Sequence, residues 1–329
     1  MLKRTISGAV LIVIMIVLII LGGIPFGAFM MAVSLVAVYE LCRACRVHDT
    51  GVSNQTGYTN IADVGDVNAA ARKAGPKKLP FNLIEVFAYI TTVLLYVVIT
   101  YYSSMYDKSH IKGSDGPTGV VLRGLASRIS EGDAILALIV AFILVVLAVY
   151  VLTYPKFDIR QVMSVIFITV YAPLMISFMY RTRVDNGGTM EDMIMTFLII
   201  ITASGSDMSA YFVGVNLGKH KLAPVLSPKK SVEGAVGGVL GATILNTVFA
   251  LALCAFDLFE LKYIWIFALI GAVGSVISQI GDLAASAIKR SFDIKDYGNV
   301  IPGHGGAMDR LDSILVVAPI IYMMIRLLQ

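Results

Sequence analysis

Four aspartates in the C-terminal half of the chain stand where apolar stretches begin or end. Asp207 and Asp282 each lie at the end of a long apolar run, and Asp309 and Asp312 are three residues apart, on one helical face at the start of another. Charged groups within or beside membrane-length helices are costly, so each is a functional candidate. Several carboxylates without a matching group of cysteines or histidines suit Mg2+ or Mn2+ and disfavour zinc. We therefore expect a divalent cation at these helix ends.

Basic and hydroxyl side chains share the faces of these helices. Residues at i, i+4, i+7 and i+8 lie on one side of a helix. That spacing places an acid, a hydroxyl and two bases on one stripe: Asp282, Ser286, Lys289 and Arg290. A second stripe runs from Asp207 through Gly214 and Gly218, where the glycines serve either helix packing or the close approach of a ligand. Acids and bases would therefore face one cleft.

Two polar loops between these helices supply further candidates. The first contains two lysines followed by an expected helix start: Lys229, Lys230, Ser231 and Glu233. Free N–H groups and the positive end of a helix dipole beside lysines form a phosphate site. The second loop begins at Lys295 and Asp296 and continues into a glycine-rich turn around His304. We expect His304 to touch phosphate or shape this turn rather than to ligate metal.

The elements that must position these residues are membrane helices. The chain has 329 residues, of which 57% are hydrophobic and only 15% charged, too few for the surface of a soluble globule of this size. Long stretches free of charge reach the roughly 18 to 20 residues that cross a bilayer, and Gly22, Gly23 and Pro25 break the first stretch into two helices. The sequence predicts an all-α polytopic integral membrane protein with about nine transmembrane helices.

Charge in the connecting loops predicts the orientation. With alternate loops on opposite sides, 18 of the 26 Lys and Arg residues fall on the side of the N-terminus. The positive-inside rule then places the N-terminus in the cytoplasm and, after nine crossings, the C-terminus outside. We expect a multi-pass protein of the cell (inner or plasma) membrane, with the active site facing the cytoplasm.

We divide the chain into two regions. Residues 1–180 form an N-terminal membrane region of five spans, with a cytoplasmic loop at 46–80 and an outside loop at 103–132, and residues 181–329 form a catalytic region of four spans. Other features of the first region have simpler interpretations. Glu40 and Glu85 are interpreted as solvated or snorkelling helix ends, the cysteines as packing residues, and the basic N-terminus with its long apolar run as a span rather than a signal peptide.

The C-terminal signature resembles that of the phosphatidate cytidylyltransferases, also called CDP-diacylglycerol synthases. The residues that carry it are Ser286-Ala287-Ile288-Lys289-Arg290, Lys295-Asp296, Gly298, Pro302, His304-Gly305-Gly306 and Asp309-Arg310-Leu311-Asp312. Residues 207–211 and 227–234 look like upstream motifs of the same family, so the resemblance covers about 207–313. Ala307 departs from it, because the family usually has a larger apolar residue there, at a packing position.

The resemblance implies that CTP and phosphatidate are converted to CDP-diacylglycerol and pyrophosphate with a divalent cation. A phosphate monoester has a second pKa of about 6, so the attacking phosphate is already largely ionised. Catalysis then reduces to alignment of the reactants and neutralisation of their charge. We expect catalytic roles for Asp282, Asp309, Lys289 and Arg290, with Mg2+ or Mn2+ held by Asp282, Asp309 and Asp312. Expected substrate contacts are Asp207, Lys229, Lys230, Ser231, Glu233, Ser286, Lys295, Asp296, His304 and Arg310.

Partners and rival functions complete the predictions. Among the substrate contacts, Asp207, Ser231 and Glu233 are candidates for orienting the nucleotide or a second cation. Expected partners are CTP, phosphatidate and membrane lipid, with a homodimer as a family-level expectation and no nucleic acid, because the basic residues are spread over short loops. A CTP-dependent polyprenol or lipid kinase would also combine many spans with a CTP site. In an ion-coupled transporter, Asp207 and Asp282 would instead carry protons or sodium ions. The aspartate motif of the CDP-alcohol phosphotransferases is absent.

Overall fold

The computed structural model describes residues 2–47, 82–110, 130–154, 156–298, 300 and 305–328. Most of the predicted loops at 46–80 and 103–132 therefore lie outside the described residues, as does His304. The helices are α1 (Leu2–Leu21), α2 (Gly23–Ala44), α4 (Leu83–His110), α6 (Glu131–Leu152), α7 (Ile159–Thr169), α8 (Met175–Val184), α9 (Met190–Leu217), α10 (Val232–Ala255), α11 (Ile264–Ser291) and α12 (Met308–Leu328), with a hairpin of β1 (Lys221–Ala223) and β2 (Ser227–Ser231).

The predicted class is confirmed: this is an all-α polytopic membrane protein. In the described part of the chain, eight helices are long and apolar enough to cross a membrane, with α7 and α8 counted as one span from Ile159 to Val184. The ninth predicted span corresponds to α1. Within α1, the segment Ile12–Leu21 is apolar but shorter than the other eight spans. The predicted break after it is also present, because Gly22 (φ 60°) and Gly23 (φ 48°) adopt left-handed backbone between α1 and α2.

Local sequence explains where several helices begin and how one is interrupted. Ser130, Asp158 and Thr189 cap the first turns of α6, α7 and α9, each in a reciprocal capping box. Pro173 lies in a π-helical turn, Val170–Leu174, between α7 and α8. A proline has no backbone N–H to donate, so the helix passes it through this wider turn.

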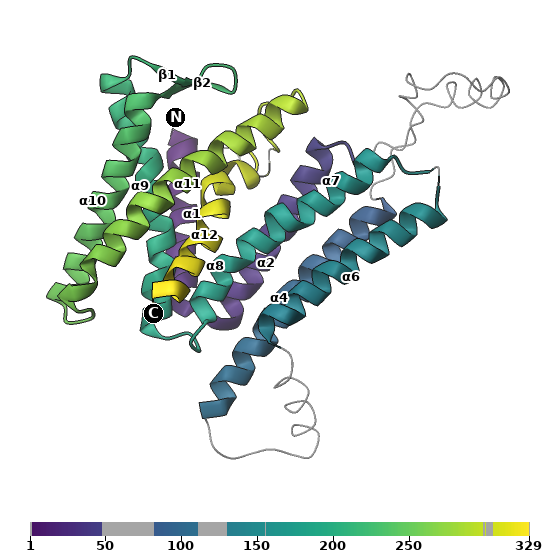
Figure 1. Ribbon diagram of the computed structural model, residues 1–329, viewed down its shortest axis with the longest axis horizontal. Coiled ribbons are helices and arrows are strands. Elements are labelled where there is room, and N and C mark those ends of the chain that lie inside the picture. Colours follow the sequence, from purple (N-terminus) through teal and green to yellow (C-terminus); the bar gives the residue numbers. More distant parts are fainter. Residues whose placement is uncertain are drawn as a thin grey trace.

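The helices form one bundle with two chemically different ends (Figure 1). Helices α9, α10, α11 and α12 lie together with α1, while α4 and α6 lie on the other side of α2 and α8. One end, which we call the hairpin end, carries the β1–β2 hairpin, the last turns of α2 and α11 and the start of α12. The opposite end, the far end, carries the loop 185–189 between α8 and α9 and the last turn of α12.

The glycines of α10 pack inside this chain. A methyl group on Gly237 would lie 2.5 Å from Val213 of α9, and one on Gly241 would collide with Ser209 of the same helix. Small residues at this G-x-x-x-G spacing let two helices approach closely. The face is therefore used between α9 and α10 of one chain, and a homodimer stays a prediction that this stripe does not support.

Candidate active site

Carboxylates from three helices gather at the hairpin end. Asp207 on α9 and Asp312 on α12 each lie close enough to Asp282 on α11 to interact with it electrostatically, and they interact with each other. The Ser313 hydroxyl donates a hydrogen bond of 2.9 Å to Oδ2 of Asp207, which ties α12 to α9. We call Asp207, Asp282 and Asp312 the acid triad.

The hairpin brings a lysine to this triad. The Nζ atom of Lys230, on β2, forms an ion pair with Oδ2 of Asp282, and both side chains are about a quarter exposed (26% and 28%). Lys230 also interacts favourably with Asp207. The phosphate-type loop and the acids were predicted from separate parts of the sequence, and the structure brings Lys230 and the triad together.

Asp309 is held differently from the acid triad. Its Oδ1 accepts a hydrogen bond from Nζ of Lys289 at 2.9 Å, and its Oδ2 accepts from the backbone N–H groups of Tyr297 (2.9 Å) and Gly306 (3.1 Å). Only 7% of the Asp309 side chain and 11% of the Lys289 side chain are exposed. Asp309 therefore joins the end of α11 and the segment after it to the start of α12, with both oxygens engaged.

No ready-made metal site is present in the described part of the chain. Within the described ranges, no three Asp, Glu, His or Cys side chains are arranged so that they could hold a metal ion together. The triad has carboxylate donors, whereas Asp309 is occupied by Lys289 and two amides. Of the three predicted ligands, Asp282 and Asp312 therefore lie together, and Asp309 has another set of partners.

Two predicted substrate contacts hold the hairpin instead. The hydroxyl of Ser231 caps α10 by accepting from the N–H of Gly234 at 3.1 Å. The Glu233 carboxylate accepts from the N–H of Lys219 at 3.0 Å and pairs with Nδ1 of His220 at 2.6 Å. These contacts fix the hairpin on α10, and so the position of the strand that carries Lys230.

The other predicted site residues surround this centre. Arg290 is exposed and donates to the carbonyl of Ile294 at 3.0 Å. Ser286 is half-buried on α11. Four further residues are exposed at the same end: Lys229, Lys295, Asp296 and Arg310. The exposed basic residues can meet a phosphorylated ligand from outside, but their roles remain predictions.

Glu40 and Glu85 are buried, contrary to the prediction from the sequence. Both were interpreted as solvated or snorkelling ends, yet they are only 1% and 2% exposed. Glu40 Oε1 accepts from the N–H of Ala307 at 3.0 Å, and Oε2 accepts from the N–H of Met308 at 2.9 Å. Because the last turns of α2 pack against the start of α12, backbone donors replace water around this carboxylate.

A cavity opens beside Glu40 at the hairpin end. It has a volume of about 490 Å³ and lies between the end of α2 and residues 294–298, with Tyr39, Arg43 and Asp296 in its lining. Arg43 donates to the hydroxyl of Tyr39 at 2.6 Å. This volume falls in the range of small-molecule sites.

Comparison with known proteins identifies the family. A model described as the cytidylyltransferase family matches residues 81–328, most of the chain. The chain belongs to the cytidylyltransferase family. The resemblance to phosphatidate cytidylyltransferases predicted from the signature is thereby confirmed at the level of the family.

Curated relatives carry the more specific name. Phosphatidate cytidylyltransferase of Bacillus subtilis (strain 168) is 45% identical over 131 residues, which are 40% of this chain and 47% of the relative. The proteins of that name from Staphylococcus haemolyticus and Staphylococcus saprophyticus are both 33% identical, over 56% and 57% of this chain and 66% and 68% of their own length. The chain therefore matches about half to two thirds of the length of these relatives.

The matched region contains every predicted site residue of this family member, but it excludes α2. Glu40 is therefore an acid at the hairpin end that the family model does not cover. An acid close to the end of an apolar helix was the only signal for it in the sequence. Its partners lie 267 and 268 positions away, a pairing that no local pattern encodes.

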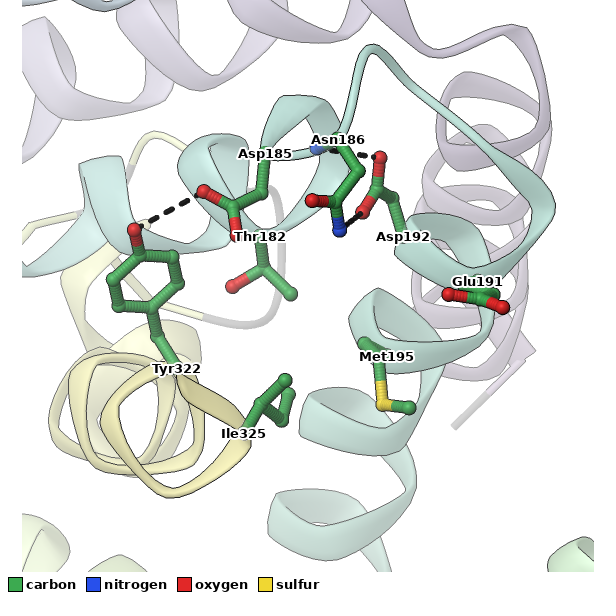
Figure 2. A pocket seen from close by; sticks show the side chains of 8 residues that line it. All are labelled: Thr182, Asp185, Asn186, Glu191, Asp192, Met195, Tyr322 and Ile325. Carbon is green, nitrogen blue, oxygen red and sulfur yellow. Dashed lines mark hydrogen bonds between the residues drawn. The ribbon is translucent and has the colours of Figure 1, made fainter. Parts of the chain in front are cut away.

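The far end also contains charged side chains, and its buried acid Asp192 is held by an amide and backbone N–H groups. Asp192 is 3% exposed and accepts from the N–H and side-chain amide of Asn186 and the N–H groups of Gly188 and Thr189. The cavity beside it (Figure 2) encloses only about 10 Å³, about the volume of one water molecule. This cavity is too small to hold a substrate of the cytidylyltransferase family.

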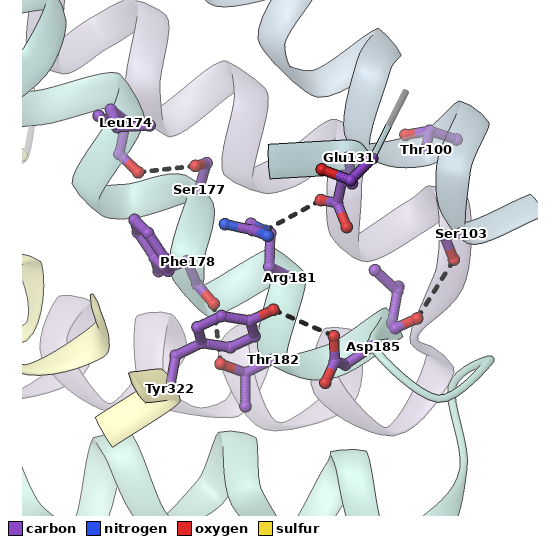
Figure 3. A network of polar contacts seen from close by, with 12 residues as sticks. Thr100, Ser103, Glu131, Leu174, Ser177, Phe178, Arg181, Thr182, Asp185 and Tyr322 are labelled. Atoms are coloured by element: carbon purple, nitrogen blue, oxygen red, sulfur yellow. Dashed lines mark hydrogen bonds and ion pairs between the residues drawn. The ribbon is translucent and has the colours of Figure 1, made fainter. Parts of the chain in front are cut away.

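A polar network at the same end joins the two halves of the bundle (Figure 3). Nε of Arg181 on α8 lies 2.9 Å from Oε1 of Glu131 on α6. On α12, the Tyr322 hydroxyl donates to Oδ1 of Asp185 at 3.2 Å, and Nη2 of Arg326 lies 2.5 Å from the same atom. Acids and bases are matched here, which indicates a structural role.

Proposed function

We propose that this chain is a phosphatidate cytidylyltransferase, which converts CTP and phosphatidate to CDP-diacylglycerol and pyrophosphate. The observation that carries the proposal is the acid triad with Lys230, at one end of a bundle of apolar helices. The names of the relatives support the same reaction. Phosphatidate presents its phosphate at the membrane surface, where the hairpin end of membrane-spanning helices would meet it.

The reaction requires alignment more than proton transfer. The phosphate of phosphatidate is largely ionised at neutral pH, since its second pKa is about 6, and it attacks the α-phosphorus of CTP. A P–O bond forms there as the bond to the departing pyrophosphate breaks, roughly in line. Lys230 and the exposed bases around it would neutralise the phosphates, and the rigid packing of α9, α11 and α12 would hold the two reactants in one orientation.

The donor set fits Mg2+ or Mn2+. The acid triad supplies only carboxylate oxygens, the ligands such cations prefer. Two of its acids, Asp207 and Asp282, interact with Lys230, while Lys289, which interacts with Asp312, is already paired with Asp309. Because no three described acids are arranged to hold a cation by themselves, we assign the cation to one or two carboxylates of the triad, with phosphate oxygens of CTP as further ligands, rather than to Asp309. Such a cation would neutralise charge on the triphosphate during the transfer.

The proposed site faces the cytoplasm, which is the compartment of CTP. Most Lys and Arg residues of the loops fall on the side of the N-terminus. The N-terminus lies at the hairpin end (Figure 1), so the positive-inside rule supports a cytoplasmic hairpin end. The cell membrane is the proposed location of this multi-pass protein. The homodimer predicted from the family requires a face other than the α9–α10 contact.

Replacing Asp282 tests the proposed function. Asp282→Asn keeps the shape of the side chain and removes its charge, so CTP-dependent formation of CDP-diacylglycerol in membranes should fall by about 100-fold or more. Asp257→Asn, at an exposed far-end position, is the matched control and should keep normal turnover. Release of pyrophosphate rather than CDP would separate the reaction from that of a lipid kinase. Near-normal turnover of Asp282→Asn would contradict the proposed site.

A further inference from the structure

We propose that Glu40 is a positioning residue for the nucleotidyl transfer site, acting from outside the region that the family model covers. The inference rests on the proposed function. Glu40 lies in the last turns of α2, 1% exposed, and its two oxygens each accept one backbone N–H from the start of α12. Its partners are the N–H groups of Ala307 and Met308.

Helix chemistry explains why a carboxylate suits this place. The first N–H groups of a helix have no partner within the helix, and the positive end of the helix dipole lies there. Serine, threonine or aspartate next to the first turn usually satisfies such groups. In α12, whose first residue is Met308, an acid from a distant helix satisfies one of them, and the charge strengthens both hydrogen bonds.

Two glycines of the signature region leave room for this carboxylate. A methyl group on Gly298 would lie 2.6 Å from Oε1 of Glu40, and one on Gly306 would lie 2.5 Å from Oε2. Neither glycine has the positive φ that only a residue without a side chain adopts easily. The need for glycine at both positions is therefore explained by the space that Glu40 occupies.

The segment that Glu40 holds leads directly to the proposed active site. The N–H of Gly306 donates to Asp309, and one turn further Asp312 belongs to the acid triad and Ser313 bonds to Asp207. If Glu40 were lost, the part-buried N–H of Ala307 and the buried N–H of Met308 would lose their acceptor, and the start of α12 could shift. Such a shift would move Asp312 relative to the acids of α9 and α11. A misplacement of about 1 Å costs up to about 100-fold in rate.

Substitution of Glu40 tests the role. Glu40→Gln retains one acceptor oxygen but directs an amide group at the second N–H, and Glu40→Ala removes both acceptors. For each we expect kcat to fall by about 10-fold or more, while the KM values for CTP and phosphatidate change by less than about 3-fold, in protein that still elutes as a single species from size-exclusion chromatography. The matched control is Glu191→Gln at the exposed start of α9, which should behave like wild type.

A double-mutant cycle gives a readout that loss of stability alone would not produce. Gly306→Ala should lower kcat in the presence of Glu40, because the added methyl group collides with its carboxylate. In the Glu40→Ala background the methyl group has space, so the same substitution should cost little, and the two effects should be strongly non-additive. Gly306→Ala also carries the test alone if the Glu40 variants do not accumulate, since near-normal turnover of that variant would overturn the inference.

The other outcomes have definite meanings. Near-normal turnover of Glu40→Gln and Glu40→Ala would overturn the inference, and so would a loss confined to KM, because Glu40 would then act by binding substrate in the adjoining cavity. Effects that multiply in the double mutant would also contradict it. If wild type and Glu191→Gln formed no CDP-diacylglycerol, the proposed function would fail instead, which keeps the two failures distinguishable.

Discussion

The hairpin end and the far end of the bundle both contain acids and bases, but their acids have different neighbours. At the far end, Asp185 lies against Tyr322 and Arg326, and Glu131 pairs with Arg181. At the hairpin end, Asp282 pairs with Lys230, which also interacts with Asp207, while Asp312 interacts with Lys289, which is paired with Asp309. Balanced charges stabilise a fold without a ligand, whereas grouped acids repel one another until a cation joins them. The grouping of three acids from separate helices, rather than the presence of acids, distinguishes the hairpin end.

Removal of divalent cations should give the largest effect that separates the two ends. Chelation with EDTA should lower turnover by about 1,000-fold, because the triad would lose the charge that neutralises the triphosphate. Activity should return with Mg2+ or Mn2+, which would show that chelation had not unfolded the protein irreversibly. Full activity after chelation, confirmed by metal analysis, would remove the cation from the proposal.

A pair of matched substitutions, one at each end, should give an effect of intermediate size on turnover. Asp312→Asn should reduce CDP-diacylglycerol formation by about 100-fold, since it removes one charge of the triad. Asp185→Asn keeps a hydrogen-bond acceptor for Tyr322 and loses an ion pair with the half-exposed Arg326, so turnover should change less than about 3-fold. Equal losses in the two variants, measured in the same membranes, would show that the ends are not functionally distinct.

Thiol labelling should distinguish the ends with the smallest effect on turnover. In a chain without its natural cysteines, Val225→Cys lies in the hairpin and Glu260→Cys at the far end, and both positions are exposed. A membrane-impermeant maleimide should label position 260 in intact cells and position 225 only after permeabilisation. The reverse pattern would contradict a cytoplasmic active site.

Much of the fold followed from composition and local signals. Apolar runs fix membrane helices because the bilayer demands internal hydrogen bonding, and Gly22 and Gly23 mark the first break because few other residues adopt a positive φ. The sequence also indicated Asp207, Asp282 and Asp312 as functional acids, and the structure groups them. The position of each acid at the end of an apolar run was the signal, whereas the grouping of these three, with Asp207 in place of the predicted Asp309, depends on how α9, α11 and α12 pack.

The roles of Asp309 and Glu40 could not be predicted in the same way. The partners of Asp309 include the backbone N–H groups of Tyr297 and Gly306. Nearly every residue has a backbone N–H group, so no residue type in the sequence marks these two as partners. Glu40 depends on how α2 packs against α12, a long-range contact set by the whole bundle. Side-chain patterns predicted the acids of the triad, which are not held by backbone N–H groups of distant segments. They did not predict the partners of Asp309 and Glu40, which are held by such groups.

The contact between α2 and α12 affects how much of the chain must be kept in any shortened version. A fragment cut to residues 81–328 would retain the whole family match and all the signature residues. It would lack the acceptor for the N–H groups of Ala307 and Met308, leaving the first turn of the last helix without its anchor. We therefore expect the smallest working unit to extend upstream of the recognisable signature, and a transplant of that signature into another scaffold to need an acid from a neighbouring helix.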